Sequence, residues 1–161
     1  MKAGTVATSL LVLAATTFPA SSETLGWGGK AGEESAVVFK SGLNTSSAVI
    51  KLKQDGDDAE RYCDYYLNAD DIPKCVSNIL ENPAKETYTA NCLTGEFSRF
   101  PGTHMQFLGR TDKYNGDLKV PEYPPEYLIQ GEAGNILDDT SASGYSLMFE
   151  IFGALCPSRV K

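Results

Sequence analysis

Four cysteines constrain the fold of this chain more than any other feature of its sequence. They are Cys63, Cys75, Cys92 and Cys156, and an even number of cysteines is typical of disulfides formed in an oxidising compartment. Three pairings are possible, and we favour Cys63–Cys75 because these residues are close in sequence and fall on two consecutive predicted helices. Cys92–Cys156 would then be the second bridge. A metal site is the alternative, but the spacings contain no CxxC and His104 is the only histidine.

The N-terminal residues have the pattern of an export signal. Lys2 precedes an apolar run at residues 10–15, and small residues at positions 20–22 offer a cleavage site. The apolar run is much shorter than the roughly 20 residues of a membrane-spanning helix, which favours a signal peptide over a transmembrane anchor. We therefore expect residues 1–22 to be a signal peptide and the protein to be periplasmic or secreted.

The residues that follow are enough for one domain with a hydrophobic core, but not for two. We expect a flexible arm at residues 23–35, which hold four glycines, and a single domain at residues 36–157. The formal net charge of the chain is −7. A chain this acidic, with no basic cluster, is a poor candidate for binding nucleic acid or an anionic membrane surface, whereas a cationic partner would be favoured. No other apolar stretch approaches the length of a membrane span.

Hydrophobic periodicity predicts a helical hairpin in the first half of the domain. From Asp57, which is a candidate cap, apolar residues repeat at helical spacing as far as Leu67. A second helix is predicted over Ile72–Leu80, with Asp71 as its cap. The cysteines of the favoured short bridge fall on the inward faces of both helices, so that bridge would join the two arms.

A last helix is predicted just before Cys156. Its apolar residues fall at i, i+1, i+4, i+5 and i+8, which is one face of an α-helix and fits no strand alternation. These residues are Leu147, Met148, Ile151, Phe152 and Leu155. Ser143 is the candidate N-cap, and Pro157 marks the end because it cannot continue the helix. We expect this helix to lie on a sheet.

Between the hairpin and the last helix, the chain consists of short runs rich in Tyr, Thr and Phe, separated by turn signals. The predicted strands of this part are Thr87–Cys92, Glu96–Phe100, His104–Leu108 and Glu126–Gln130, and shorter ones are predicted at Ala36–Phe39, Ala48–Leu52 and Ile136–Leu137. We therefore expect an α+β fold, in which an antiparallel β-meander of four or five strands is combined with a helical hairpin and a C-terminal helix and is held by two disulfides.

No residue pattern identifies a catalytic centre. His104 could act as a general base only beside a nucleophile, and Ser141 and Ser143 are the candidates, without a GxSxG motif to support them. The acidic segment 55–60 resembles the start of a calcium loop, but Tyr66 stands where an EF-hand needs a glutamate. We predict no catalytic residues, no metal and no cofactor. A hydrolase acting on cell-wall material, which would need two carboxylates facing each other across a cleft, stays an alternative.

The segment between the third and fourth strands of the meander is rich in proline and tyrosine. Tyr114 and Tyr123, with Tyr127 at its end, could form a stiff aromatic contact surface, because tyrosine is enriched at the sites that dominate binding. The alternative is a loop that covers an open face of the sheet. The sequence is compatible with a contact surface and with a covering loop.

Four short motifs follow one another in the second half of the chain. They are C-x-x-G-x-F at residues 92–97, F-x-G-R at 107–110, L-D-x-x-S-A-S-G-Y at 137–145 and F-x-x-L-C-P at 152–157. This series resembles a family of small exported proteins of rhizobia and related Gram-negative bacteria, in which the third motif reads LDGSSASGY. The resemblance covers about residues 60–157. It implies a periplasmic or secreted location and no particular activity.

Ser141–Tyr145 is also similar to the S-x-S-G loop with which periplasmic inhibitors of C-type lysozyme block a glycosidase cleft. Those inhibitors have a disulfide near the C-terminus, but their lysine and following strands are absent here. An acidic protein and a cationic lysozyme would attract each other. We therefore expect a non-enzymatic exported module that binds a protein or envelope partner, with a lysozyme inhibitor as an alternative. The hypothetical partner-binding residues are Ser141, Ser143, Tyr145, Tyr114 and Tyr123.

Overall fold

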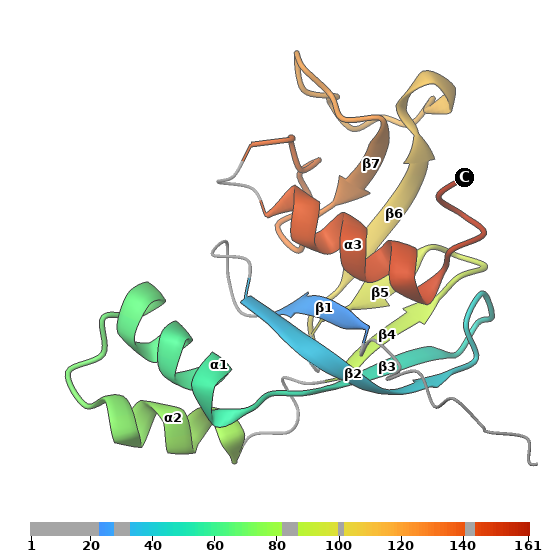
Figure 1. The fold of residues 1–161 in the computed structure, drawn as a ribbon. Coiled ribbons are helices and arrows are strands. Elements are labelled where there is room, and N and C mark those ends of the chain that lie inside the picture. The colour runs from blue at the N-terminus through green and yellow to red at the C-terminus, as the bar shows by residue number, and fades with distance from the viewer. Residues whose placement is uncertain (1–22, 28–32, 82–86, 100–101, 141–143) are drawn as a thin grey trace, which may run out of the picture.

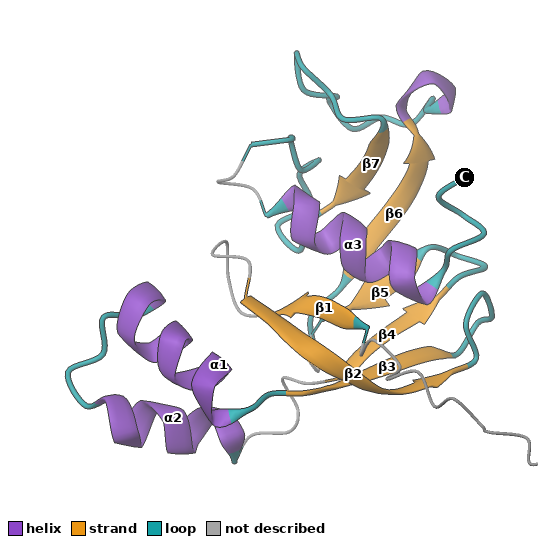
Figure 2. Cartoon of the chain, viewed as in Figure 1, coloured by secondary structure: helices purple, strands orange, loops and turns teal. Residues whose placement is uncertain are grey.

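The computed structural model describes residues 23–27, 33–81, 87–99, 102–140 and 144–161, and the predicted signal peptide lies outside them. One sheet curls around a C-terminal helix, and a helical hairpin lies to one side of it (Figure 1). Figure 2 separates the same elements into helix, strand and loop. The predicted α+β fold, with an antiparallel sheet, a hairpin, a last helix and two disulfides, is confirmed.

The sheet is an antiparallel meander of seven strands in sequence order, not four or five. Its strands are β1 (Thr24–Trp27), β2 (Glu33–Ser41), β3 (Ala48–Lys53), β4 (Thr87–Asn91), β5 (Glu96–Ser98), β6 (Met105–Arg110) and β7 (Tyr127–Gln130). The flexible arm expected at residues 23–35 is wrong for residues 24–27 and 33–35, because these form β1 and the start of β2. The last predicted strand is only an isolated bridge between Gln130 and Ile136.

Alternate residues of the strands point to the two faces of the sheet, as the two-residue period of a strand requires. Ala48, Ile50 and Leu52 of β3 are buried on the inner face, whereas Lys51 and Lys53 between them are exposed on the outer face. The inner face therefore forms one side of the hydrophobic core. The outer face stays open over β3 to β6.

The last helix, α3 (Tyr145–Leu155), fills the hollow of the curled sheet (Figure 1). Phe152 is completely buried, and its ring centroid lies 4.2 Å from that of Phe107 and 5.2 Å from that of Phe97. Four of the five predicted core residues of this helix are buried, and Leu147 is half-buried. The N-cap is Gly144, with a φ of 73° and no side-chain cap, so the prediction of Ser143 at this position is wrong.

The edge strand β1 is joined to the core by polar groups. The Gly26 amide donates a hydrogen bond to a carboxylate oxygen of Glu150 on α3, at 3.1 Å. The Gly26 carbonyl accepts one from the buried hydroxyl of Tyr88 on β4, at 2.6 Å. These partners occupy backbone groups that an edge strand otherwise offers to another chain.

The hairpin consists of α1 (Gly56–Arg61), the π-helical turn η1 (Tyr62–Tyr66) and α2 (Ile72–Leu80). The bounds of α2 and its Asp71 cap are as predicted. The cap of α1 is Asp55 and not Asp57, since the Asp55 carboxylate accepts from the Asp58 amide at 2.8 Å.

The π-turn changes which residues of the hairpin face inward. The Leu67 amide donates to the Tyr62 carbonyl at 3.0 Å, which is the i to i+5 bond of a π-helix. The extra residue in this turn rotates the following side chains out of the α-helical stripe. Ala59 and Cys63, before or within the turn, are buried, but Leu67 is 49% exposed. The expected apolar face of this helix therefore ends at the π-turn.

Both predicted disulfides are present. Cys63–Cys75 joins the two arms of the hairpin with its Cα atoms 6.0 Å apart, and Cys92–Cys156 joins the turn after β4 to the end of α3 with its Cα atoms 5.5 Å apart. All four cysteines are thus paired. Within the described residues, no helix combines the length and the apolar character needed to cross a membrane.

Candidate functional site

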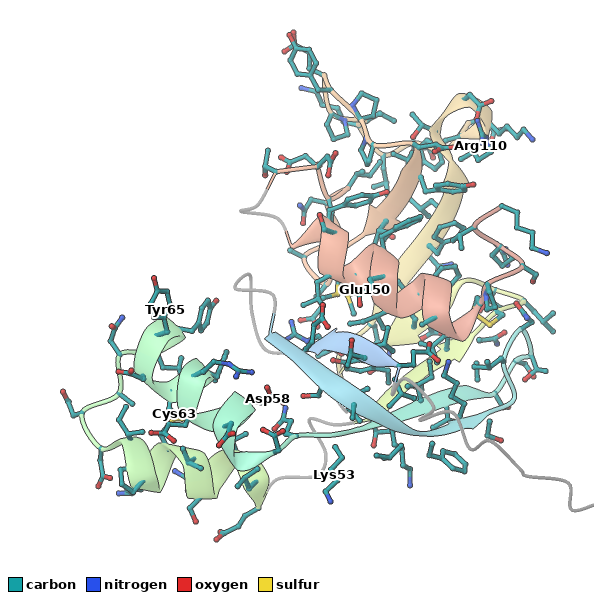
Figure 3. All side chains as sticks on the ribbon, in the orientation of Figure 1. Lys53, Asp58, Cys63, Tyr65, Arg110 and Glu150 are labelled. Atoms are coloured by element: carbon teal, nitrogen blue, oxygen red, sulfur yellow. A yellow bond between two sulfur atoms is a disulfide. The ribbon has the colours of Figure 1, made fainter. Side chains whose placement is uncertain are left out.

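The loop between β6 and β7 is held to the sheet at its base. The Thr111 amide donates to the Glu126 carbonyl at 2.9 Å, and the Thr111 hydroxyl donates to the Pro125 carbonyl. Arg110 forms ion pairs with Asp112 at 3.0 Å and with the Glu126 carboxylate at 2.7 Å (the position of Arg110 is labelled in Figure 3). These bonds, together with the prolines, limit the conformations that the loop can adopt.

The three tyrosines of this region have different environments. Tyr114 folds over its own loop, because its hydroxyl accepts from the Leu118 amide at 3.3 Å and a Cβ at Gly116 would lie 2.4 Å from it. Tyr127 is buried in β7. Tyr123 is 81% exposed. Only Tyr123 has the exposure expected of a contact residue.

Tyr123 lies at a shallow pocket that the sequence did not predict. Pro121, Glu122 and Tyr123 of the loop line it on one side, and Asp138, Asp139 and Thr140 of the turn before α3 line it on the other. Its volume is about 320 Å³. Three of these described residues are carboxylates and none is basic. We call this the loop-end pocket.

The remaining hypothetical contact residues lie in or beside the turn before α3. Ser141 and Ser143 lie outside the described residues. Tyr145 is buried, and its hydroxyl donates to the Tyr127 carbonyl at 2.8 Å. Burial raises the pKa of Tyr145 to about 12. Tyr145 is therefore a core residue, and the expectation that it contacts a partner is corrected.

His104 lies on the open face of the sheet. Its Nδ1 is 3.1 Å from a carboxylate oxygen of Glu96, and the side chains are 74% and 55% exposed. Two shallow depressions, of about 390 Å³ and about 270 Å³, lie on either side of this pair. Glu96 was not predicted as a partner of His104. It begins β5 and pairs with Gln106, two residues after His104, so the two side chains are diagonal neighbours across the paired strands.

In the part of the chain that the structure describes, the His104–Glu96 pair has no nucleophile bonded to it. Among the described residues, Glu96 is the only hydrogen-bond partner of His104. The nearby Ser98 hydroxyl lies 3.1 Å from the Thr103 hydroxyl and has no bond to the imidazole. General-base catalysis on a hydroxyl nucleophile needs that contact, and both groups here are open to water.

The described carboxylates do not form a metal centre. Within the part of the chain that the structure describes, no three His, Cys, Asp or Glu side chains lie close enough together to hold a metal ion. Asp55, which begins the segment that resembles a calcium loop, caps α1 instead.

Comparison of this chain with family models, with curated proteins and with solved structures finds no match. The resemblance to small exported proteins therefore stays a prediction, and the residues described above are the basis for proposing a function.

Proposed function

We propose that this chain is an exported, non-enzymatic interaction module that contacts a protein partner through the loop-end pocket. The observation that carries the proposal is the 81% exposure of Tyr123 beside a pocket formed by two separate segments. An exposed large aromatic ring at a concave site is the kind of residue that dominates binding energy in protein interfaces.

The bonds at the base of the loop favour this role. Thr111 and Arg110 fix the point where the loop returns to β7, and Pro121 and Pro125 restrict the backbone on either side of Tyr123. A contact residue that is held before binding loses little conformational entropy when the complex forms.

The lining of the pocket suits a cationic group. Glu122, Asp138 and Asp139 supply carboxylates, and the ring of Tyr123 can accept a cation on its face. A lysine or arginine side chain of a partner protein would meet both kinds of group. The net charge of −7 would attract the same class of protein over a longer distance.

Export to the periplasm or the medium is supported by the two disulfides, because such bonds persist in oxidising compartments. The signal-peptide pattern at residues 1–22 and the resemblance to exported proteins of rhizobia agree with this location. Function as a periplasmic inhibitor of C-type lysozyme is the narrower alternative, favoured by the acidic pocket. The cell-wall hydrolase has less support, since His104 and Glu96 are exposed and neither is bonded to a nucleophile among the described residues.

Titration of the oxidised protein with C-type lysozyme tests both the proposed interaction module and the narrower lysozyme inhibitor. Binding that falls about tenfold in Tyr123→Ala, but not in the control Leu93→Ala, whose side chain is 74% exposed and lies outside the pocket, would place the contact at the loop-end pocket. Loss of lysozyme activity in the same mixture would support the lysozyme-inhibitor alternative, and binding without inhibition would contradict that alternative.

Peptides selected from a displayed random library serve as probes if lysozyme does not bind. The proposal expects selected peptides that lose affinity for Tyr123→Ala and keep it for the control Leu93→Ala. Peptides that bind both variants equally would contradict the loop-end pocket as the contact site.

A further inference from the structure

The net charge of this protein is concentrated in the helical hairpin. Residues 55–81 hold eight of the 21 acidic residues and only two of the 14 basic ones, which is a net charge of −6 out of −7 for the chain. The sheet and α3 are therefore nearly neutral. In Figure 1 the hairpin lies at the opposite end of the molecule from the loop between β6 and β7.

Half of the eight hairpin carboxylates have no partner among the described residues. Asp55 and Asp71 cap helices, Asp58 pairs with Arg61, and Glu81 accepts a hydrogen bond from the Ser77 hydroxyl at 2.8 Å. The other four are Asp57, Glu60, Asp64 and Asp70, which are exposed and make no ion pair with a described residue. Their charges therefore face solvent.

The same part of the hairpin exposes large apolar side chains. Tyr65 is 87% exposed, Leu67 49% and Tyr66 37%, and we call these three residues the hairpin tip. Figure 3 shows Tyr65 projecting outward from the end of the helix. Single exposed apolar residues are ordinary, but the hairpin tip exposes three large ones at one end of a helix, and exposed apolar area that is gathered in one place is typical of interaction sites.

The exposure of Tyr66 and Leu67 results from the π-turn, whereas Tyr65 would lie off the inward stripe of a regular helix as well. Without the extra residue of η1, Tyr66 and Leu67 would follow Ala59 and Cys63 on the inward stripe of the helix. The turn is supported by the stacked rings of Tyr62 and Tyr66, whose centroids are 5.0 Å apart, and by the disulfide at Cys63. A single π-turn within a helix is frequent at functional sites.

We propose that the hairpin tip is a second interaction surface, which docks a basic amphipathic segment of another protein. The apolar side of that segment would cover Tyr65, Tyr66 and Leu67, and its lysines or arginines would lie against the surrounding carboxylates. Charge complementarity selects this occupant, since a net charge of −6 repels anionic lipid and nucleic acid.

Titration of the isotope-labelled, oxidised protein with a short amphipathic leucine–lysine peptide tests this proposal by NMR. We expect shifts confined to residues 56–67, and an affinity that falls about tenfold in Tyr65→Ser with Leu67→Ser. The control is Leu93→Ser, which removes an apolar side chain that is 74% exposed and belongs to neither proposed surface, and it should leave the affinity unchanged.

A peptide with the same lysines, but with serine in place of leucine, separates docking from general charge attraction. The proposal expects this peptide to bind at least about tenfold more weakly at about 0.1 M salt, where the Debye length is about 10 Å. Equal binding of the two peptides, or shifts at the loop-end pocket instead of the hairpin, would overturn it. The proposed function rests on Tyr123 and is contradicted by neither result.

Discussion

Tyr145 is a buried residue of the hydrophobic core. It follows a turn of small polar residues, yet its ring is buried and lies 5.8 Å from that of Phe149. Its hydroxyl satisfies the Tyr127 carbonyl in the edge strand β7. The residue therefore joins the start of α3 to the sheet.

Replacement of Tyr145 with Phe removes this hydroxyl and leaves the Tyr127 carbonyl without its partner. We expect the free energy of unfolding to fall by about 1 to 2 kcal/mol. Urea denaturation measures this difference. The control, Tyr123→Phe, changes an exposed hydroxyl and should alter stability by less than about 0.5 kcal/mol.

Alkaline pH should destabilise the protein through the same residue. Burial raises the pKa of Tyr145 to about 12, whereas an unfolded tyrosine has a pKa of about 10. Below about pH 10 the hydroxyl is protonated in both states, and above it the unfolded state loses its proton first. Stability is therefore complete below about pH 10 and is lost as the pH rises toward about 12.

The urea midpoint, followed from about pH 9 to about pH 12, measures this loss. In Tyr145→Phe the urea midpoint should fall less steeply with pH. It should still fall, because burial also raises the pKa of Tyr88. An equally steep decline in the variant would show that Tyr145 does not contribute.

The elements that the sequence predicts best are those with local signals. Helix α2 has an Asp cap, an early proline and a regular apolar stripe, and both of its ends were predicted correctly. The short disulfide followed from the hairpin, and the long one followed by elimination. Local chemistry determines these features, so the sequence alone is enough.

The features that were missed depend on distant residues. Strand β1 contains a glycine, Gly26, and it is ordered by Glu150 and Tyr88 rather than by its own propensity. The loop-end pocket needs residues 121–123 and 138–140 to meet, which no local pattern indicates. The π-turn at Tyr62–Tyr66 interrupts the regular helical period. The period therefore could not predict that Tyr66 and Leu67 are exposed.

The two disulfides should differ in what they stabilise. Cys63–Cys75 closes a short loop around a hairpin with few buried residues, and the chain-entropy model assigns it about 3 kcal/mol. Replacing both cysteines with Ala should expose the amides of α1 and α2 to hydrogen exchange while those of β3 and β4 stay protected. Loss of protection throughout the sheet would contradict this local role.

Cys92–Cys156 should stabilise the sheet, in contrast to the local effect of Cys63–Cys75 on the hairpin. It closes a longer loop and joins the turn after β4 to α3, so its removal should lower the global free energy of unfolding by about 4 kcal/mol. The same exchange experiment should then show weaker protection in the sheet and in α3 together.

At the scale of the whole molecule, the uneven charge makes the hairpin sensitive to salt. Raising the salt from about 0.01 M to about 1 M shortens the Debye length from about 30 Å to about 3 Å and screens the repulsion among hairpin carboxylates. We expect slower amide exchange in α1 and α2, corresponding to less than about 1 kcal/mol, and little change in β3 and β4. Asp64→Asn should reduce the response, and an equal effect of salt on all elements would contradict the uneven distribution.

A nearly neutral body with an anionic appendage is an electric dipole. In the field of a cationic protein, such a molecule turns during diffusion, so that its hairpin arrives first and its opposite end last. The order of the two contacts would then be set before either surface touches, and ionic strength would act on the speed of encounter more than on the lifetime of the complex.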